Sequence, residues 1–126
     1  MKNSIIIAGK EFPIRWSMSV TKAVAQIGDL ENIGDLLQSD KPVDQIKGID
    51  ALADVLSLLI NAGARFYNWF EAPATPYKGL TRDQILDFST DGDWSDFLEA
   101  IVKEREDALH RTIESLEDDS KNAVSG

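Results

Sequence analysis

The single histidine, His110, lies among carboxylates at helical spacing and is the first candidate for chemistry. Glu106 and Glu114 are one helical turn away on either side, and Asp107 precedes His110 by three residues. A metal centre of this kind needs three or four converging ligands, and a di-metal helix bundle needs a second Glu-x-x-His element, which this sequence lacks. The simpler interpretation is a histidine on the solvated face of a helix.

Three aspartates, Asp87, Asp91 and Asp93, surround Gly92 and resemble a loop of oxygen ligands. An EF-hand needs its glycine at the sixth position and a glutamate at the twelfth, and the spacing here does not fit. A turn followed by a helix cap is the interpretation that we adopt.

Other catalytic motifs are missing from the sequence. It has no Gly-rich phosphate loop, no nucleophile elbow, no His-Glu-x-x-His and no cysteine, so acid–base or covalent catalysis has few candidates. We therefore predict no catalytic residue, cofactor or metal. A small enzyme that uses carboxylates with a divalent cation is kept as an alternative.

Aromatic side chains are concentrated near residue 70 and again near residue 95. Four of them fall within the five positions 66–70, so they cover more than one side of a helix. Core packing accounts for some of them, but a chain of 126 residues has limited interior. Apolar surface that is left over typically marks a protein partner or self-association. We predict that six residues contact a partner: Phe66, Trp69, Phe70, Trp94, Phe97 and Ile101.

Composition supports a soluble globular chain with a strongly acidic end. Hydrophobic residues make up 43% and charged residues 28%, as in ordinary globular proteins. Residues 82–126 carry a net charge of −8 out of the total of −9. Such a chain is repelled by phosphate backbones and anionic lipids, so we expect no nucleic-acid or membrane partner. The apolar run at residues 5–8 is too short for a signal peptide, and we expect a cytoplasmic protein.

The elements that must position these residues begin with a predicted β-hairpin. Apolar residues alternate over residues 5–7 and again over 12–16, on either side of a turn at residues 8–11. The hairpin therefore has one apolar face that must pack on something else. Pro13 cannot donate a ladder hydrogen bond, so we expect it on a free edge.

Helical spacing and caps predict the rest of the chain. After Ser17 or Ser19 as a cap, helices are predicted over 20–27, 32–37, 43–70, 82–88 and 94–117. Gly63 bends or ends the straight part of the long helix, Thr81 and Gln84 form a capping box, and Asp93 caps the last helix. The fold class is mainly α, with an N-terminal β-hairpin packed on a four- to five-helix bundle around one long central apolar helix. Residues 1–117 form one domain, and residues 118–126 a flexible acidic and polar tail.

The order of these elements resembles a known family. The segment IIIAGKEFPIRWS at residues 5–17 is similar to the start of tail assembly chaperones of long-tailed bacteriophages and prophages, with a strand, a Gly-Lys-Glu-aromatic turn, a second strand and a helix. A long apolar helix over 49–70, LTRDQI at 80–85, an acidic turn and DFLEAI at 96–101 follow in the same order. The resemblance covers most of residues 5–113.

The resemblance implies a non-enzymatic helper. It would coat the helical tape-measure protein, or another tail protein, in the bacterial cytoplasm before the tail tube polymerises. Self-association into a homo-oligomer is left open. A structural or regulatory adaptor that stays in the phage particle is the alternative.

Overall fold

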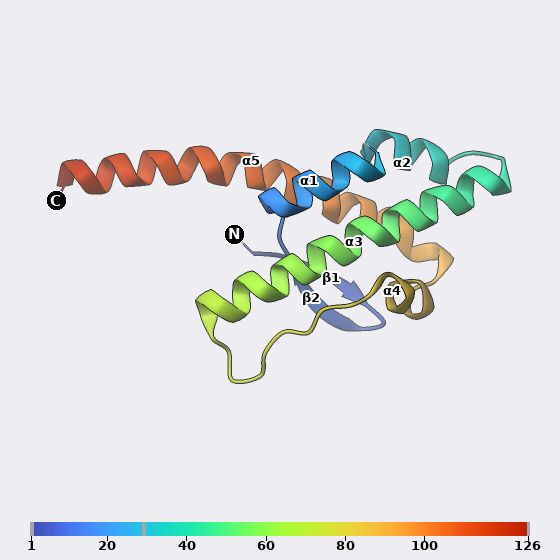
Figure 1. Ribbon diagram of the computed structural model, residues 1–126, viewed down its shortest axis with the longest axis horizontal. Coiled ribbons are helices and arrows are strands. Elements are labelled where there is room, and N and C mark those ends of the chain that lie inside the picture. Colours follow the sequence, from blue (N-terminus) through green and yellow to red (C-terminus); the bar gives the residue numbers. More distant parts are fainter. Residues whose placement is uncertain (1, 29, 126) are drawn as a thin grey trace.

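The computed structural model describes residues 2–28 and 30–125, with side chains described up to Arg111. The described chain is mostly helical, with one two-stranded antiparallel hairpin followed by five α-helices, as the sequence predicted. Figure 1 shows α3 (Pro42–Glu71) running through the molecule, with α1 (Met18–Ile27) and α2 (Leu30–Leu37) along one side. The hairpin and α4 (Arg82–Phe88) lie along its other side.

The hairpin joins β1 (Asn3–Ile7) to β2 (Lys10–Ile14) through a two-residue turn. Ala8 and Gly9 both have positive φ, 51° and 77°, which is the type I′ conformation that matches the twist of paired strands. The turn is shorter than the predicted one, because the two residues after Gly9 already pair in the ladder. The inner face of the hairpin is buried, as predicted, through Ile5, Ile7, Phe12 and Ile14.

The outer edge of β2 packs closely against α3. Pro13 has no neighbouring strand there, as expected, but the edge is not free: Pro13 is buried, and its carbonyl group lies against Gly63 of α3. The backbone N–H of Arg15 then donates to the carbonyl oxygen of Leu59 at 3.2 Å. The long helix extends to Glu71, eight residues beyond Gly63, and a bend or an end of its straight part at Gly63 stays a prediction. The missing side chain of Gly63 lets the strand approach the helix.

The local signals at the helix ends are confirmed where hydrogen bonds define them. The hydroxyl of Ser17 accepts from the backbone N–H of Val20, which makes Ser17 the cap of α1. Thr81 and Gln84 form the predicted capping box, with distances of 2.9 and 3.1 Å. The second helix begins two residues earlier than predicted, at Leu30.

The last helix, α5 (Trp94–Ser125), follows directly on a short 3₁₀ turn, η1 (Asp91–Asp93). Asp93, predicted to cap α5, lies in that turn, and its carboxylate accepts from the backbone N–H of Thr90 at 2.9 Å. The helix passes the predicted end at residue 117. The predicted flexible tail over residues 118–126 lies outside the residues whose side chains are described.

A buried carboxylate joins α5 to the hairpin. Glu104 is fully buried and accepts from the side-chain amide of Asn3 at 2.8 Å. Its two oxygens also contact the guanidinium of Arg111, at 2.6 and 3.2 Å. The carboxylate raises the pKa of Arg111, first through these hydrogen bonds. The charged face of α5 is therefore not entirely solvated.

Candidate protein-binding surface

The six side chains predicted to contact a partner differ widely in burial. Trp69 and Phe70 are 80% and 69% exposed, Phe66 and Trp94 are half-buried, and Phe97 and Ile101 are 4% and 0% exposed. The structure therefore brings Phe66, Trp69 and Phe70 together near the end of α3. It places the other three on α5.

Phe66, Trp69 and Phe70 form a surface that we call the aromatic patch. They are spaced by three and four residues, so they share one side of the last turns of α3. The rings of Phe66 and Phe70 have centroids 4.6 Å apart. The guanidinium of Arg15 lies over the ring of Phe66, 3.4 Å from its centroid, in a cation–π contact. Phe66 thus connects the exposed ring of Phe70 to the segment after β2.

The helix end that carries the aromatic patch is tied to the N-terminus by an ion pair. Both carboxylate oxygens of Glu71 lie 2.8 Å from Nζ of Lys2, which also donates to the hydroxyl of Tyr77 at 3.0 Å. The hydrogen bond from Lys2 lowers the pKa of Glu71, and the same bond raises the pKa of Lys2. These contacts fix the last turn of α3.

The loop after α3 is held by polar side chains on that helix. The side chain of Asn68 accepts from the backbone N–H of Tyr77 at 2.7 Å and donates to its carbonyl oxygen at 3.0 Å. Ser57 and Asn61 both donate to the carbonyl oxygen of Leu80, at 2.7 and 3.0 Å. Because the loop is held in this way, it returns along α3 to α4.

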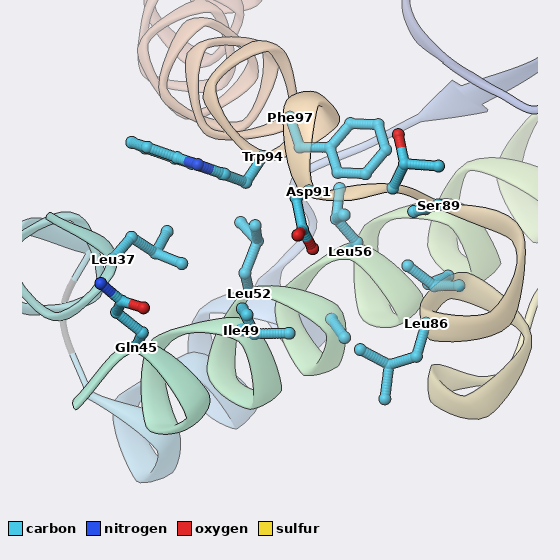
Figure 2. A pocket seen from close by; sticks show the side chains of 13 residues that line it. Leu37, Gln45, Ile49, Leu52, Leu56, Leu86, Ser89, Asp91, Trp94 and Phe97 are labelled. Atoms are coloured by element: carbon cyan, nitrogen blue, oxygen red, sulfur yellow. The ribbon is translucent and has the colours of Figure 1, made fainter. Parts of the chain in front are cut away.

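A second surface, which we call the apolar groove, opens between the other end of α3 and its neighbours. It encloses a cavity of about 330 Å³. Figure 2 shows Leu37 of α2 on one side, Leu86 of α4 on the other, and Trp94 and Phe97 of α5 above the side chains of α3. The α3 wall consists of Ile49, Leu52, Ala53 and Leu56.

An exposed apolar row on α3 leads into the apolar groove. Val43, Ile46 and Ile49 follow one another at three-residue spacing and are 63%, 59% and 38% exposed. Such residues are neighbours on a helix surface, and Ile49 is also part of the groove wall. The groove and the aromatic patch are separate, because Ile49 and Trp69 are about 30 Å apart along α3 at 1.5 Å per residue.

A few polar residues also line the apolar groove. Gln45 of α3 lies on the side of Leu37, Ser89 lies on the opposite side, and Asp91 lies between them (Figure 2). The Ser89 hydroxyl oxygen is buried and has no hydrogen-bond partner within the described residues. The groove therefore offers apolar walls and a small number of polar groups, the usual composition of a binding site.

Two of the six residues predicted to contact a partner are buried in the core. Ile101 lines neither surface, and Phe97 lies in the wall of the apolar groove. At Phe97 and Ile101 the apolar stripe of α5 faces the body of the molecule. The spacing of apolar residues alone does not distinguish a core contact from a partner contact.

Sequence reasoning missed most walls of the apolar groove. Leu37, Ile49 and Leu86 were assigned only to helices, because each has the spacing of an ordinary buried face. The sequence contained one signal. Val43, Ile46 and Ile49 put apolar side chains on the first turns of the long helix, where little of the fold is available to bury them. Their exposure became visible only with the neighbouring helices in place.

Neither acidic cluster forms a metal site among the described side chains. No three histidine, aspartate or glutamate side chains converge there as ligands would, and His110 is exposed on α5. Within the same residues, no helix has both the length and the apolar character that crossing a bilayer requires.

Comparisons of this chain with protein-family models, with curated proteins and with solved structures found no match in any of the three.

Proposed function

We propose that this chain is a tail assembly chaperone of a long-tailed bacteriophage or prophage, a non-enzymatic protein that binds the helical tape-measure protein before the tail tube polymerises. The observation that carries the proposal is the exposure of Trp69 and Phe70. Tryptophan and aromatic rings dominate the binding energy of protein interfaces, and neighbouring exposed rings are costly to leave in water. The resemblance of residues 5–113 supplies the family.

The charge of the chain fits this role. A long apolar helix without its tube exposes an apolar stripe that aggregates. A helper with a net charge of −9 keeps such a complex dispersed through self-repulsion. Because binding is reversible, tube subunits that compete for the same stripe would release the helper by mass action.

The proposal also covers how the elements are arranged and where the protein acts. We propose that α3 is the central apolar helix on which the hairpin packs, and that α3 presents the aromatic patch at one end. The protein acts in the cytoplasm of the bacterial host, where the tail is built. Several copies would cover one tape-measure helix, either singly or as a homo-oligomer.

Co-expression with the tape-measure protein of the same phage tests the proposal. We expect a soluble complex with the wild-type chain, and loss of that complex when Trp69→Ala and Phe70→Ala are combined. Ile6→Ala is the matched control, because Ile6 is 64% exposed on the hairpin and lies outside the aromatic patch. A tape-measure protein that stays insoluble with the wild-type chain, or a complex that the double variant retains, would contradict the assignment.

Mass spectrometry of purified particles separates a chaperone from the structural or regulatory adaptor. A chaperone leaves before the tail is complete, so it should be absent from finished particles. Recovery in a fixed ratio to the tail proteins would identify an adaptor instead.

A further inference from the structure

The apolar groove has features of a docking site that the aromatic patch does not share. We propose that it binds one amphipathic helix of a partner protein, and that a lysine or arginine beside the apolar stripe of that helix pairs with Asp91. The inference concerns a separate surface. It stands whether or not the partner is a tape-measure protein.

The shape of the apolar surface favours an elongated occupant. The exposed row on α3 runs from Val43 to Ile49, about 9 Å along the helix, and meets the groove at Ile49; the wall residues beyond it are buried. A small molecule in the 330 Å³ cavity would leave Val43 and Ile46 in water. An amphipathic helix laid along the exposed row, with one large side chain in the cavity, would cover both, which is the usual way in which such a helix binds a groove.

The charge at the groove specifies the kind of helix. Asp91 is exposed and lines the groove, and Figure 2 shows its carboxylate directed toward the α3 side chains. No side chain in the described part of the molecule forms a hydrogen bond or an ion pair with it. Arg82 is already paired with Asp50 at 2.7 Å and Asp54 at 3.3 Å.

A cation from the partner would find favourable surroundings at Asp91. The carboxylate lies beside apolar walls, where a docked helix excludes water and strengthens a charge-assisted hydrogen bond. A carboxylate on the incoming helix would be repelled at this position.

Binding of two labelled model peptides, followed by fluorescence anisotropy, tests the inference. Both peptides have about 14 residues, blocked ends and leucines along one helical stripe, with lysines flanking the stripe in one and glutamates in the other. About 0.3 M salt reduces the general attraction of a cation to an acidic chain. We expect the lysine peptide to bind and the glutamate peptide to bind at least about tenfold more weakly.

Two pairs of variants place the binding in the groove. Asp91→Asn should raise the Kd of the lysine peptide about fivefold or more, whereas Asp87→Asn, which removes the same charge from an exposed residue outside the groove, should change it less than about twofold. Ile49→Ala should weaken binding to a similar extent, and Ile6→Ala should not.

Three results of the peptide experiments would overturn the inference. They are no binding of the lysine peptide, equal binding of the two peptides, and equal effects of Asp91→Asn and Asp87→Asn, which would indicate attraction to the acidic surface in general. A dimer of the chain that Ile49→Ala abolishes, and that the lysine peptide does not displace, would make a second copy the occupant and would also overturn it.

Discussion

The backbone N–H of Trp16 donates a hydrogen bond to the carboxylate of Glu104, with 2.6 Å between N and Oε2. The two residues are 88 positions apart in the sequence. The same carboxylate holds Asn3 and Arg111, so one side chain connects the first strand, the segment before α1 and the last helix. A buried charge is tolerated here because each of its oxygens has partners.

Glu104→Ala is expected to lower the free energy of unfolding by about 3–5 kcal/mol, because it leaves the hydrogen bonds from the Trp16 amide and the Asn3 side chain unmade and removes the buried carboxylate that pairs with Arg111. Urea denaturation measures this loss. Glu106→Ala, at an exposed position on the same helix, should change stability by less than about 0.5 kcal/mol. Equal effects of the two substitutions would contradict the structural role of Glu104.

Gly63→Ala should destabilise the protein by about 1–3 kcal/mol. A Cβ atom there would meet the carbonyl group of Pro13 and come within 3.0 Å of Cα of Ile14, so the backbone of β2 would have to move. Gly34→Ala is the control, since its Cβ would meet only Leu98, at 3.5 Å, in an ordinary contact. That change in α2 should stabilise by about 0.4–1 kcal/mol. Thermal unfolding of both variants should therefore shift in opposite directions.

Substitutions at two of the predicted contact residues should have different effects on folding. Phe97→Ala should cost about 3–5 kcal/mol, because it removes a buried ring from the core. Trp69→Ala should cost less than about 0.5 kcal/mol, since that ring is 80% exposed. Denaturant unfolding followed by far-ultraviolet circular dichroism compares them. A large loss of stability in the Trp69 variant would show that the aromatic patch belongs to the core.

The ion pair between Lys2 and Glu71 should respond to acid. Because the pKa of Glu71 is lowered from its ordinary value of 4.5, the pair contributes fully above pH 4.5 and is lost as the pH falls through the lowered value. Lys2→Met should return the pKa of Glu71 toward 4.5, as measured by NMR titration of its carboxyl carbon. Lys10→Met removes a charge elsewhere on the hairpin and should leave the lowered value in place. An unchanged pKa in the Lys2 variant would contradict the pairing.

The sequence by itself determined the local features of this protein. The hairpin with Gly9 in its turn, the Ser17 cap and the capping box of Thr81 and Gln84 depend on hydrogen bonds and φ angles within a few residues, so local patterns predict them. The mainly helical class follows from apolar spacing for the same reason.

The tertiary structure alone decided which apolar residues reach solvent. Trp69, Phe97 and Ile49 all have helical apolar spacing, but they become a surface ring, a core residue and a groove wall. Burial depends on where the neighbouring elements end, and these neighbours are distant in the sequence. The role of Glu104 also became visible only when Asn3 and Trp16 were next to it, because hydrogen bonds across a fold leave no spacing pattern in the chain.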